Sequence, residues 1–350
     1  MSALKERKSI TVGAVTVGGG APVAIQSMTG TRTQDVAATV AQIRALQAAG
    51  CEIIRLAVPD RDAARAFGQI REQVSLPMVA DIHFDHRLAL EAVAAGADKI
   101  RINPGNIGDL HRVRQVAAAC AARGLPIRVG VNGGSLEPEI RATFGHGAEG
   151  LVESALGHVA LLNRCDFDDI CLSVKSSSVR ETVRAYRLLH ERTSYPLHLG
   201  VTEAGTAFMG TVKSAVGIGS LLLDGIGDTI RVSLTDDPVE EIKVARGILQ
   251  SVGLRSFGPD IIACPTCGRC EIDLIPLVQE VERRLADSTA EITVAIMGCV
   301  VNGPGEATAA DFGIAGGRGE GLLFRQGEVI GKAPMDALVD TLMELIARAC

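Results

Sequence analysis

Two stretches of the sequence repeat one pattern: QAAGCEIIRL at residues 47–56 and VAAGADKIRI at residues 93–102. In each, a glycine separates an alanine-rich helical pattern from a short apolar run that carries an arginine. Glycine is favoured just past a helix end, where the backbone turns left-handed. A short apolar run bounded by turn residues is typical of a buried strand. The repeat therefore indicates two successive helix-to-strand units of one kind.

The same unit recurs along the first two thirds of the chain. Helical patterns such as residues 35–50 and 109–124 alternate with strand-like runs at 22–27, 51–57, 76–82, 97–103, 126–132, 168–175, 196–202 and 227–233. Eight alternating units predict an α/β fold, the (β/α)8 or TIM barrel. An open doubly wound sheet is the alternative, but the units are nearly uniform and no GxGxxG follows the first strand. Residues 8–20, before the first unit, predict a short hairpin.

The alternation stops at Phe257, Gly258 and Pro259. We therefore expect two domains, a barrel over residues 1–258 and a small α+β domain over residues 259–350. In the second domain, helical patterns are expected at 272–287 and 333–349, and strands at 291–298, 311–317 and 321–331.

The overall composition disfavours several classes of protein. The net charge of −6 is a poor match to a protein that grips nucleic acid through its phosphates. No apolar run has membrane-spanning length, and MSALKERKSI has no apolar core of a signal peptide. We expect a cytoplasmic protein without a membrane partner, whose nine cysteines are free thiols or metal ligands.

Cations stand at the carboxyl ends of the predicted strands, where barrel enzymes place their chemistry. Five of the eight ends present one, namely Arg55, Arg101, Arg128, Lys175 and Arg231. Like charges gathered at one mouth repel one another unless an anion binds, and arginine forks match phosphate oxygens. Two nearby carboxylates, Asp81 and Glu203, do not balance five cations. We therefore predict a site for a small polyanion with two phosphate groups.

Three further strand-end residues, Asp81, His83 and Glu203, are candidates for proton transfer beside that anion. A polar residue at a strand end can instead serve only to orient its neighbours. The sequence leaves both roles open for each of the three.

The cysteines of the second domain form a metal-binding pattern. Cys264, Cys267 and Cys270 lie in CPTCGRC, and Cys299 opens CVVNGPGE. Spacing alone leaves structural zinc and an iron–sulfur cluster equally open. The turn-forming residues before Glu306 can carry its carboxylate back to the metal. Because a carboxylate is displaced more easily than a thiolate, Glu306 favours an iron site that opens to substrate.

Taken together, these motifs resemble the bacterial two-domain form of the GcpE/IspG family, 4-hydroxy-3-methylbut-2-enyl diphosphate synthase. The resemblance rests on CPTC and GCVVNGPGE and extends over IQSMT, RLAVP, ADIHFD, KIRINPGN, RVGVNGGSL, SVKSS, GVTEAG and RVSLT. It implies an iron–sulfur oxidoreductase of the non-mevalonate isoprenoid pathway. Such an enzyme reductively opens 2-C-methyl-D-erythritol 2,4-cyclodiphosphate and eliminates water to give 4-hydroxy-3-methylbut-2-enyl diphosphate.

The resemblance also implies roles for individual residues. A [4Fe–4S] cluster would be held by Cys264, Cys267, Cys299 and Glu306, and substrate would displace the glutamate. Glu203 would be the acid near the departing oxygen, with Asp81 and His83 beside it. The diphosphate clamp would comprise Arg55, Arg101, Arg128, Asn132, Lys175, Arg231 and Ser233. Cys270 is expected to be a bystander, since a fourth thiolate would close the cluster to substrate.

Partners follow from the resemblance as well. Flavodoxin or ferredoxin would supply electrons, and the cluster domain of one chain would cap the barrel of the other in a homodimer. The alternative is a non-redox barrel lyase or pterin-type transferase acting on a phosphorylated substrate, with a structural zinc in its tail. An RNA-binding zinc ribbon is disfavoured because the cysteine segment is acidic and almost free of aromatic residues.

Overall fold

The computed structural model describes residues 7–299, 305 and 307–349. Their contacts divide the chain into two compact units, residues 1–255 and 256–350. No helix in these ranges has the length and apolarity needed to cross a membrane.

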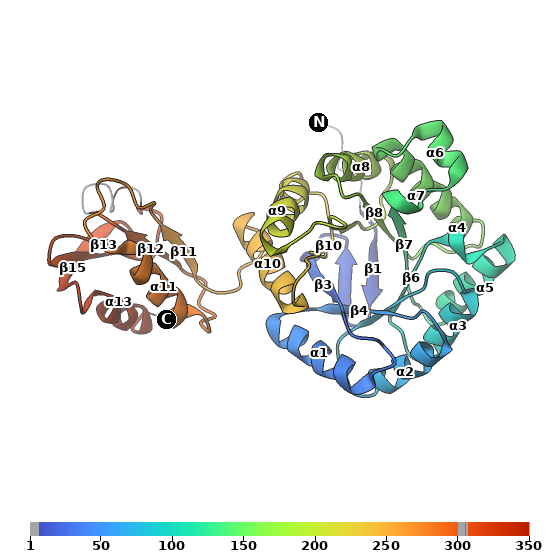
Figure 1. The fold of residues 1–350 in the computed structure, drawn as a ribbon, viewed down its shortest axis with the longest axis horizontal. Helices are drawn as coiled ribbons and strands as arrows, with labels where there is room; N and C mark the ends of the chain where they lie inside the picture. Colours follow the sequence, from blue (N-terminus) through green and yellow to red (C-terminus); the bar gives the residue numbers. More distant parts are fainter. Residues whose placement is uncertain (1–6, 300–304, 306, 350) are drawn as a thin grey trace. The chain divides into compact units, whose positions relative to one another are not determined.

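The first unit is a (β/α)8 barrel, which confirms the predicted fold class (Figure 1). Its strands are parallel and run in chain order around the sheet, which a bridge between Leu172 and Leu197 closes. The strands are β3 (Ala24–Met28), β4 (Ile53–Ala57), β5 (Met78–Asp81), β6 (Lys99–Ile102), β7 (Ile127–Asn132), β8 (Ile170–Lys175), β9 (His198–Leu199) and β10 (Thr229–Ile230).

Helices form the outer ring of the barrel (Figure 1). Five of them begin at an aspartate whose carboxylate accepts a hydrogen bond from the first helical turn, where backbone N–H groups lack helical partners. Gly50 ends α1 in the left-handed conformation, as the repeat predicted. The helices are α1 (Val36–Ala49), α2 (Arg61–Arg71), α3 (His86–Ala94), α4 (Pro104–Ile107), α5 (Leu110–Ala121), α6 (Pro138–Phe144), α7 (Ala148–Asn163), α8 (Val179–Arg192), α9 (Ala207–Leu223) and α10 (Pro238–Ser251).

The predicted N-terminal hairpin is also present, as β1 (Ser9–Val12) paired antiparallel with β2 (Val15–Gly18). It lies across one opening of the barrel (Figure 1). Ile10, Val12 and Val17 are buried there in one cluster with Ile53 and Val79, which belong to the barrel strands. Because this apolar contact closes the amino end of the barrel, only the carboxyl end is left for a polar site.

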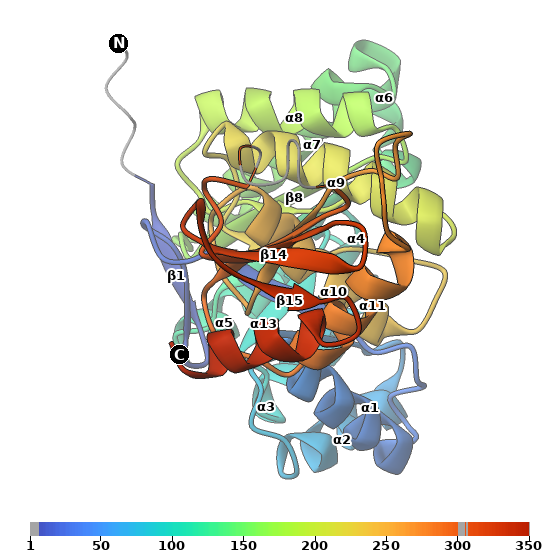
Figure 2. The ribbon, with the colours of Figure 1, turned by 90° about the vertical axis from the view of Figure 1, so that its left-hand side faces the viewer.

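The second unit is a two-layer α+β structure. Its sheet runs β11 (Asp260–Ala263), β12 (Thr293–Met297), β13 (Phe312–Gly316), β14 (Glu320–Arg325) and β15 (Glu328–Pro334), with the first three strands parallel and the last two antiparallel. Two helices, α11 (Leu274–Leu285) and α13 (Leu338–Ala347), pack on one face of the sheet (Figure 2). Their contact buries residues such as Val281 and Leu342 against Ile296 and Ile314.

Three details of this unit differ from the sequence prediction. The single strand expected over residues 321–331 is a hairpin of β14 and β15, because the chain turns at Gln326 and Gly327, both with positive φ. The edge strand β11 was not expected, because its four residues are too few to show a period and remain partly exposed. The helix expected over residues 333–349 begins only at Leu338, because β15 continues through Pro334 and pairs with β14.

Candidate functional site

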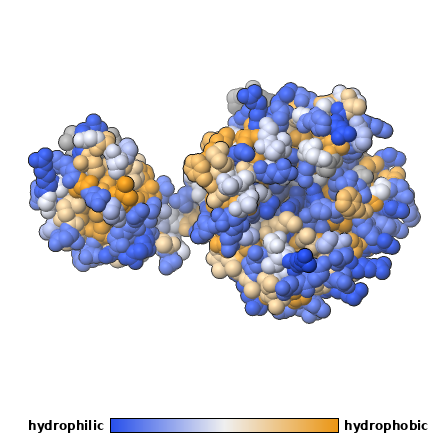
Figure 3. All heavy atoms as spheres, viewed as in Figure 1, coloured by the Kyte–Doolittle hydropathy of each residue, from blue (hydrophilic) through white to orange (hydrophobic). Residues whose placement is uncertain are grey.

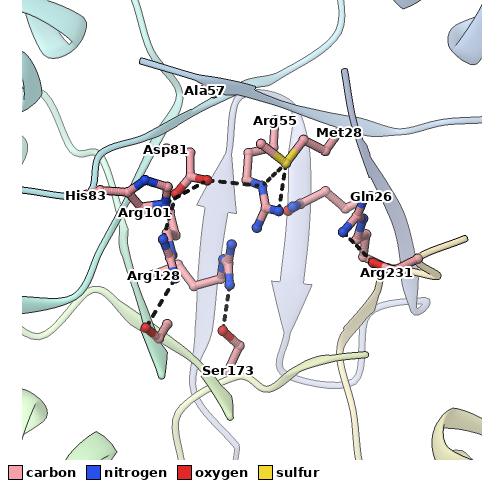
Figure 4. Close-up of polar contacts among 12 residues, drawn as sticks. Gln26, Met28, Arg55, Ala57, Asp81, His83, Arg101, Arg128, Ser173 and Arg231 are labelled. Carbon is pink, nitrogen blue, oxygen red and sulfur yellow. Dashed lines mark hydrogen bonds and ion pairs between the residues drawn. The ribbon is translucent and has the colours of Figure 1, made fainter. Parts of the chain in front are cut away.

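The predicted cations converge at the carboxyl end of the barrel interior, where Figure 4 shows the four arginines and Lys175 lies near them. Alternate strand residues face the same side, which turns these side chains inward. Arg128 is only 1% exposed, and Arg101 and Lys175 are each 7% exposed. Arg55 and Arg231 complete the group. The structure therefore brings together all five cations named from the strand ends.

Asp81, at the end of β5, is the central counter-ion of this group. Its carboxylate lies 2.9 Å from Arg101 Nη1, 3.8 Å from Arg55 Nε and 3.6 Å from His83 Nε2. Burial alone would raise the pKa of Asp81, but the neighbouring cations, Arg55 first, lower it to about 2. Asp81 therefore stays ionised at neutral pH and acts as an orienting anion.

Glu241 is a second buried carboxylate that the sequence prediction missed. It projects from α10, is 4% exposed, and lies 3.3 Å from Arg231 Nη2. It also accepts hydrogen bonds from the Leu234 N–H at 3.0 Å and from Ser27 Oγ at 3.3 Å. A glutamate in the first turn of a helix usually faces solvent, so only the three-dimensional packing identifies this one.

Arg128 and Lys175 make no ion pair within the described residues. Arg128 Nη1 donates to Ser173 Oγ at 2.5 Å, and Lys175 Nζ lies 3.5 Å from His198 Nε2. Burial, then repulsion from Arg101, lowers the pKa of Arg128 to about 10. Burial and the surrounding arginines, Arg128 first, hold the pKa of Lys175 well below its usual value. Positive charge at this mouth thus exceeds the carboxylates that face it.

Several arginine donors at this mouth also lack a hydrogen-bond partner among the residues that the structure describes. They are Nε and Nη2 of Arg128, Nε of Arg101 and Nε of Arg231. A buried donor without an acceptor is costly, typically about 1–3 kcal/mol and more for a charged group. An anion bound among these donors would satisfy them and neutralise the excess charge.

Lys99 is a sixth cation, which the sequence analysis did not select. It lies two residues before Arg101 on β6, is fully buried, and donates to Gln26 Oε1 at 3.3 Å. Burial, with Arg128 and Arg55 nearby, lowers its pKa to about 8. The period of two in a strand could have revealed it, because residues 99 and 101 face the same side.

Glycines in the barrel wall make room for two of these cations. A Cβ at Gly130 of β7 would lie 2.6 Å from Arg101 Nε. A Cβ at Gly200, just past β9, would lie 2.6 Å from Lys175 Nζ. Both distances are far below van der Waals contact, so a larger side chain at either position would displace the cation beside it.

The remaining predicted residues lie around the mouth. Asn132 ends β7 in register with Lys175 of β8, and Ser233 Oγ accepts a hydrogen bond from Arg231. Glu203 follows β9 and is exposed, with a backbone φ of 53°. That left-handed conformation is unusual for a residue other than glycine and marks a locally constrained turn. His83, at 56% exposure, remains accessible to solvent beside Asp81.

The cysteines lie at one edge of the second unit. β11 and β12 are parallel neighbours, so Cys264 and Cys299, which follow their carboxyl ends, come from the same edge of the sheet. The Gly298 N–H donates to Cys264 Sγ at 3.1 Å, a contact that stabilises thiolate ligands of metals. Cys267 is exposed between them in sequence, and Glu306 lies outside the described residues.

This donor set suits iron–sulfur chemistry, because thiolates are the usual ligands of such clusters. Within the described ranges, the structure gathers no three His, Cys, Asp or Glu side chains into a metal-binding geometry. The ligand set of the second domain therefore remains a prediction from the sequence.

Comparison with known proteins identifies the family. The model of the GcpE TIM-barrel domain matches residues 7–246, and that of the GcpE protein C-terminal domain matches residues 260–348. A protein of Geobacter sulfurreducens is 58% identical over 337 residues, covering 96% of each chain. One of Ruminiclostridium cellulolyticum is 56% identical over 343 residues, covering 98% of this chain and 97% of its own. Both are named 4-hydroxy-3-methylbut-2-en-1-yl diphosphate synthase (flavodoxin).

Among solved structures, a dihydropteroate synthetase product complex has a TM-score of 0.50 at 11% identity, covering 71% of this chain and all of that one. At this identity the likeness shows a shared barrel fold alone. The two family models and the full-length relatives carry the assignment, and the chain belongs to the GcpE family.

Proposed function

We propose that this protein is a 4-hydroxy-3-methylbut-2-enyl diphosphate synthase of the non-mevalonate isoprenoid pathway. It converts 2-C-methyl-D-erythritol 2,4-cyclodiphosphate, two electrons and two protons into the linear allylic diphosphate and water. The observation that carries the proposal is the excess of buried cations at the barrel mouth, in a chain 58% identical to a relative of that name. A non-redox barrel enzyme is not favoured, because this identity extends through the cysteine-bearing unit.

Substrate binding is the role of the barrel. The unpartnered donors of Arg128, Arg101 and Arg231 are available to the diphosphate oxygens. Charge-assisted bonds of this kind are about twice as strong as neutral ones. The proposed clamp adds the remaining residues named from the resemblance, Arg55, Asn132, Lys175 and Ser233. Asp81 and Glu241 hold the arginines in place, Asp81 through Arg101 and Arg55 and Glu241 through Arg231.

Proton delivery is assigned to the exposed groups of the mouth. Loss of water requires a proton on the departing hydroxyl, and Glu203 is the proposed donor. Its place on a constrained turn beside the mouth supports that role. His83, exposed beside Asp81, is a further candidate for proton transfer, whereas Asp81 is held ionised and is unsuited to act as an acid.

The second unit supplies the redox centre. Cys264, Cys267, Cys299 and Glu306 would hold a [4Fe–4S] cluster, which when bound provides single electrons and a Lewis-acidic iron. The backbone N–H of Gly298 stabilises the Cys264 thiolate. Cys270 donates its thiol proton to the Ile272 carbonyl at 3.2 Å, which supports its role as a bystander to the cluster.

The proposed partners are flavodoxin and a second copy of the chain. The relatives' names include flavodoxin, which supports flavodoxin as the electron donor. For the homodimer, support comes from the outer face of α9, where Phe208, Val212, Val216 and Leu223 are 41–76% exposed. Their spacing places them along one side of the helix, and Figure 3 shows apolar residues on the outer wall of the barrel near α9. Such a face is typical of a surface that another chain covers.

Anaerobic turnover tests the function. The purified protein is mixed with reduced flavodoxin and the cyclic diphosphate, and the products are followed by phosphorus NMR. We expect conversion to the linear diphosphate, abolished by Arg128→Met and by Cys267→Ser but kept by Arg65→Met, a change on the outer surface of α2. A protein with a reducible cluster that leaves the cyclic diphosphate unchanged would contradict the proposal.

A further inference from the structure

Cys270 has no role in the proposed reaction, and its thiol lies close to that of the cluster cysteine Cys264. A Cβ at Gly298 would lie 2.6 Å from Cys270 Sγ and 3.5 Å from Cys264 Sγ. The two sulfur atoms therefore lie within about 6 Å of each other, since both distances are measured from one point. Gly298 has no side chain, so nothing from this residue separates them.

Backbone hydrogen bonds fix both cysteines on the end of β12. The Cys264 N–H donates to the Ile296 carbonyl at 3.2 Å, and the Glu271 N–H donates to the Gly298 carbonyl at 3.0 Å. Both thiols are half-buried against the core of the second unit. Cys267, in contrast, is exposed in the turn between them. The pair Cys264 and Cys270 is thus positioned by the sheet, whereas Cys267 belongs to the loop.

We propose that Cys264 and Cys270 form a reversible disulfide when the protein carries no cluster. The oxidant is a small disulfide such as oxidised glutathione. One cysteine thiolate attacks it, forming a mixed disulfide and releasing one glutathione thiolate; the second cysteine thiolate then attacks the protein sulfur and releases the other. Two cysteine thiols lose two electrons, the small disulfide gains them, and the two protons end on glutathione.

This bond would protect a cluster ligand. A free thiolate is oxidised stepwise to sulfinic and sulfonic acids, which thiols cannot reverse, whereas a disulfide is restored by reduction. The hydrogen bond from the Gly298 N–H, at 3.1 Å, holds Cys264 Sγ close to Cys270. Cys270 would therefore preserve Cys264 for reassembly of the cluster. The inference goes beyond the proposed reaction and does not depend on its substrate.

Peptide mapping tests the pairing. The full-length protein, with metal removed by a chelator, is treated with oxidised glutathione, alkylated and cleaved with trypsin. Cleavage after Arg269 separates Cys270 from a peptide that contains Cys264 and Cys267. We expect these two peptides to remain joined in the wild type and in Cys267→Ser, and to separate in Cys264→Ser and Cys270→Ser. Predominant pairing of Cys267 with Cys264 or Cys299, or no crosslink, would overturn the proposal.

A second readout measures protection. The metal-free protein is exposed to oxidised glutathione, then to hydrogen peroxide, and is reduced with dithiothreitol before its thiols are counted. The wild type should recover the Cys264 thiol, whereas Cys270→Ser should accumulate severalfold more sulfinic and sulfonic acid there. Cys165→Ser, which removes a half-buried thiol of the barrel, is the matched control and should behave as wild type. Equal irreversible oxidation of Cys264 in all three proteins would contradict the protective role.

Discussion

At the scale of single residues, Arg128 destabilises the ligand-free protein but is suited to bind an anion. It is almost fully buried, makes no ion pair within the described residues, and leaves two donor atoms without acceptors. Replacing a buried, unpaired charge by an apolar side chain of similar size is often neutral or stabilising. A residue that is unfavourable in the empty protein is best explained by the ligand that it binds.

Arg128→Met should therefore raise the melting temperature of the ligand-free barrel, corresponding to about 1–3 kcal/mol of stability. The same change should abolish binding of the cyclic diphosphate. Differential scanning calorimetry measures the first effect and isothermal titration calorimetry the second, with Arg65→Met as the surface control. A variant that melts well below wild type would show that Arg128 is a structural residue.

Lys99 provides a pH-dependent test of the same idea. Its pKa is lowered from 10.5 to about 8, so between these values the unfolded chain holds a proton that the folded protein lacks. The contribution of Lys99 to the free energy of unfolding therefore rises with pH across this window. Lys99→Met should be more stable than wild type near pH 7, and this advantage should shrink as the pH approaches 10.5.

Urea unfolding of both proteins in matched buffers gives that difference. The comparison cancels other groups that titrate in the same range, such as the buried thiols, because they are common to both proteins. A stability difference that stays constant with pH would show that the Lys99 ammonium is not disfavoured by burial.

At the scale of elements, glycines in the strands leave space for the side chains of the cations. Gly130 gives Arg101 the space beside β7, and its backbone is compatible with a larger residue because its φ is not positive. Gly130→Ala should therefore fold but displace the Arg101 guanidinium. Because this displacement removes one charged hydrogen bond to the substrate, KM for the cyclic diphosphate should rise about tenfold or more. Gly157→Ala, on α7 with open space around it, is the control. An unchanged KM would exclude Arg101 from the clamp.

The sequence predicted the barrel elements well because each strand is a separate apolar run with turn residues on both sides. It also predicted which strand ends carry cations, since that depends only on where each run stops. Glu241 was missed because it belongs to a helix and reaches the site only through tertiary packing. β11 was missed because a four-residue edge strand lacks a recognisable period. Local sequence patterns therefore did not predict contacts between segments that are distant in the chain.

At the scale of the whole molecule, the two units divide the proposed chemistry. The barrel holds the clustered cations, and the second unit holds the predicted cluster ligands Cys264, Cys267 and Cys299. In the described parts of the chain, the proposed anion site belongs to one unit and the proposed cluster cysteines to the other. The proposed homodimer completes each site by joining the barrel of one chain to the cluster domain of its partner. A chain with a defective barrel should therefore be rescued by a partner chain that is defective only in its cluster domain.

The most direct test is complementation between Arg128→Met and Cys267→Ser chains. The two are co-expressed with different tags, heterodimers are isolated by two affinity steps, and anaerobic turnover of the cyclic diphosphate is measured. One of the two sites in each heterodimer then has an intact barrel and an intact cluster domain, so we predict about half of wild-type activity. Heterodimers of Arg128→Met with Arg101→Met, which both damage the barrel, should stay inactive. An inactive mixed heterodimer, or failure to isolate one, would contradict an active site shared between two chains.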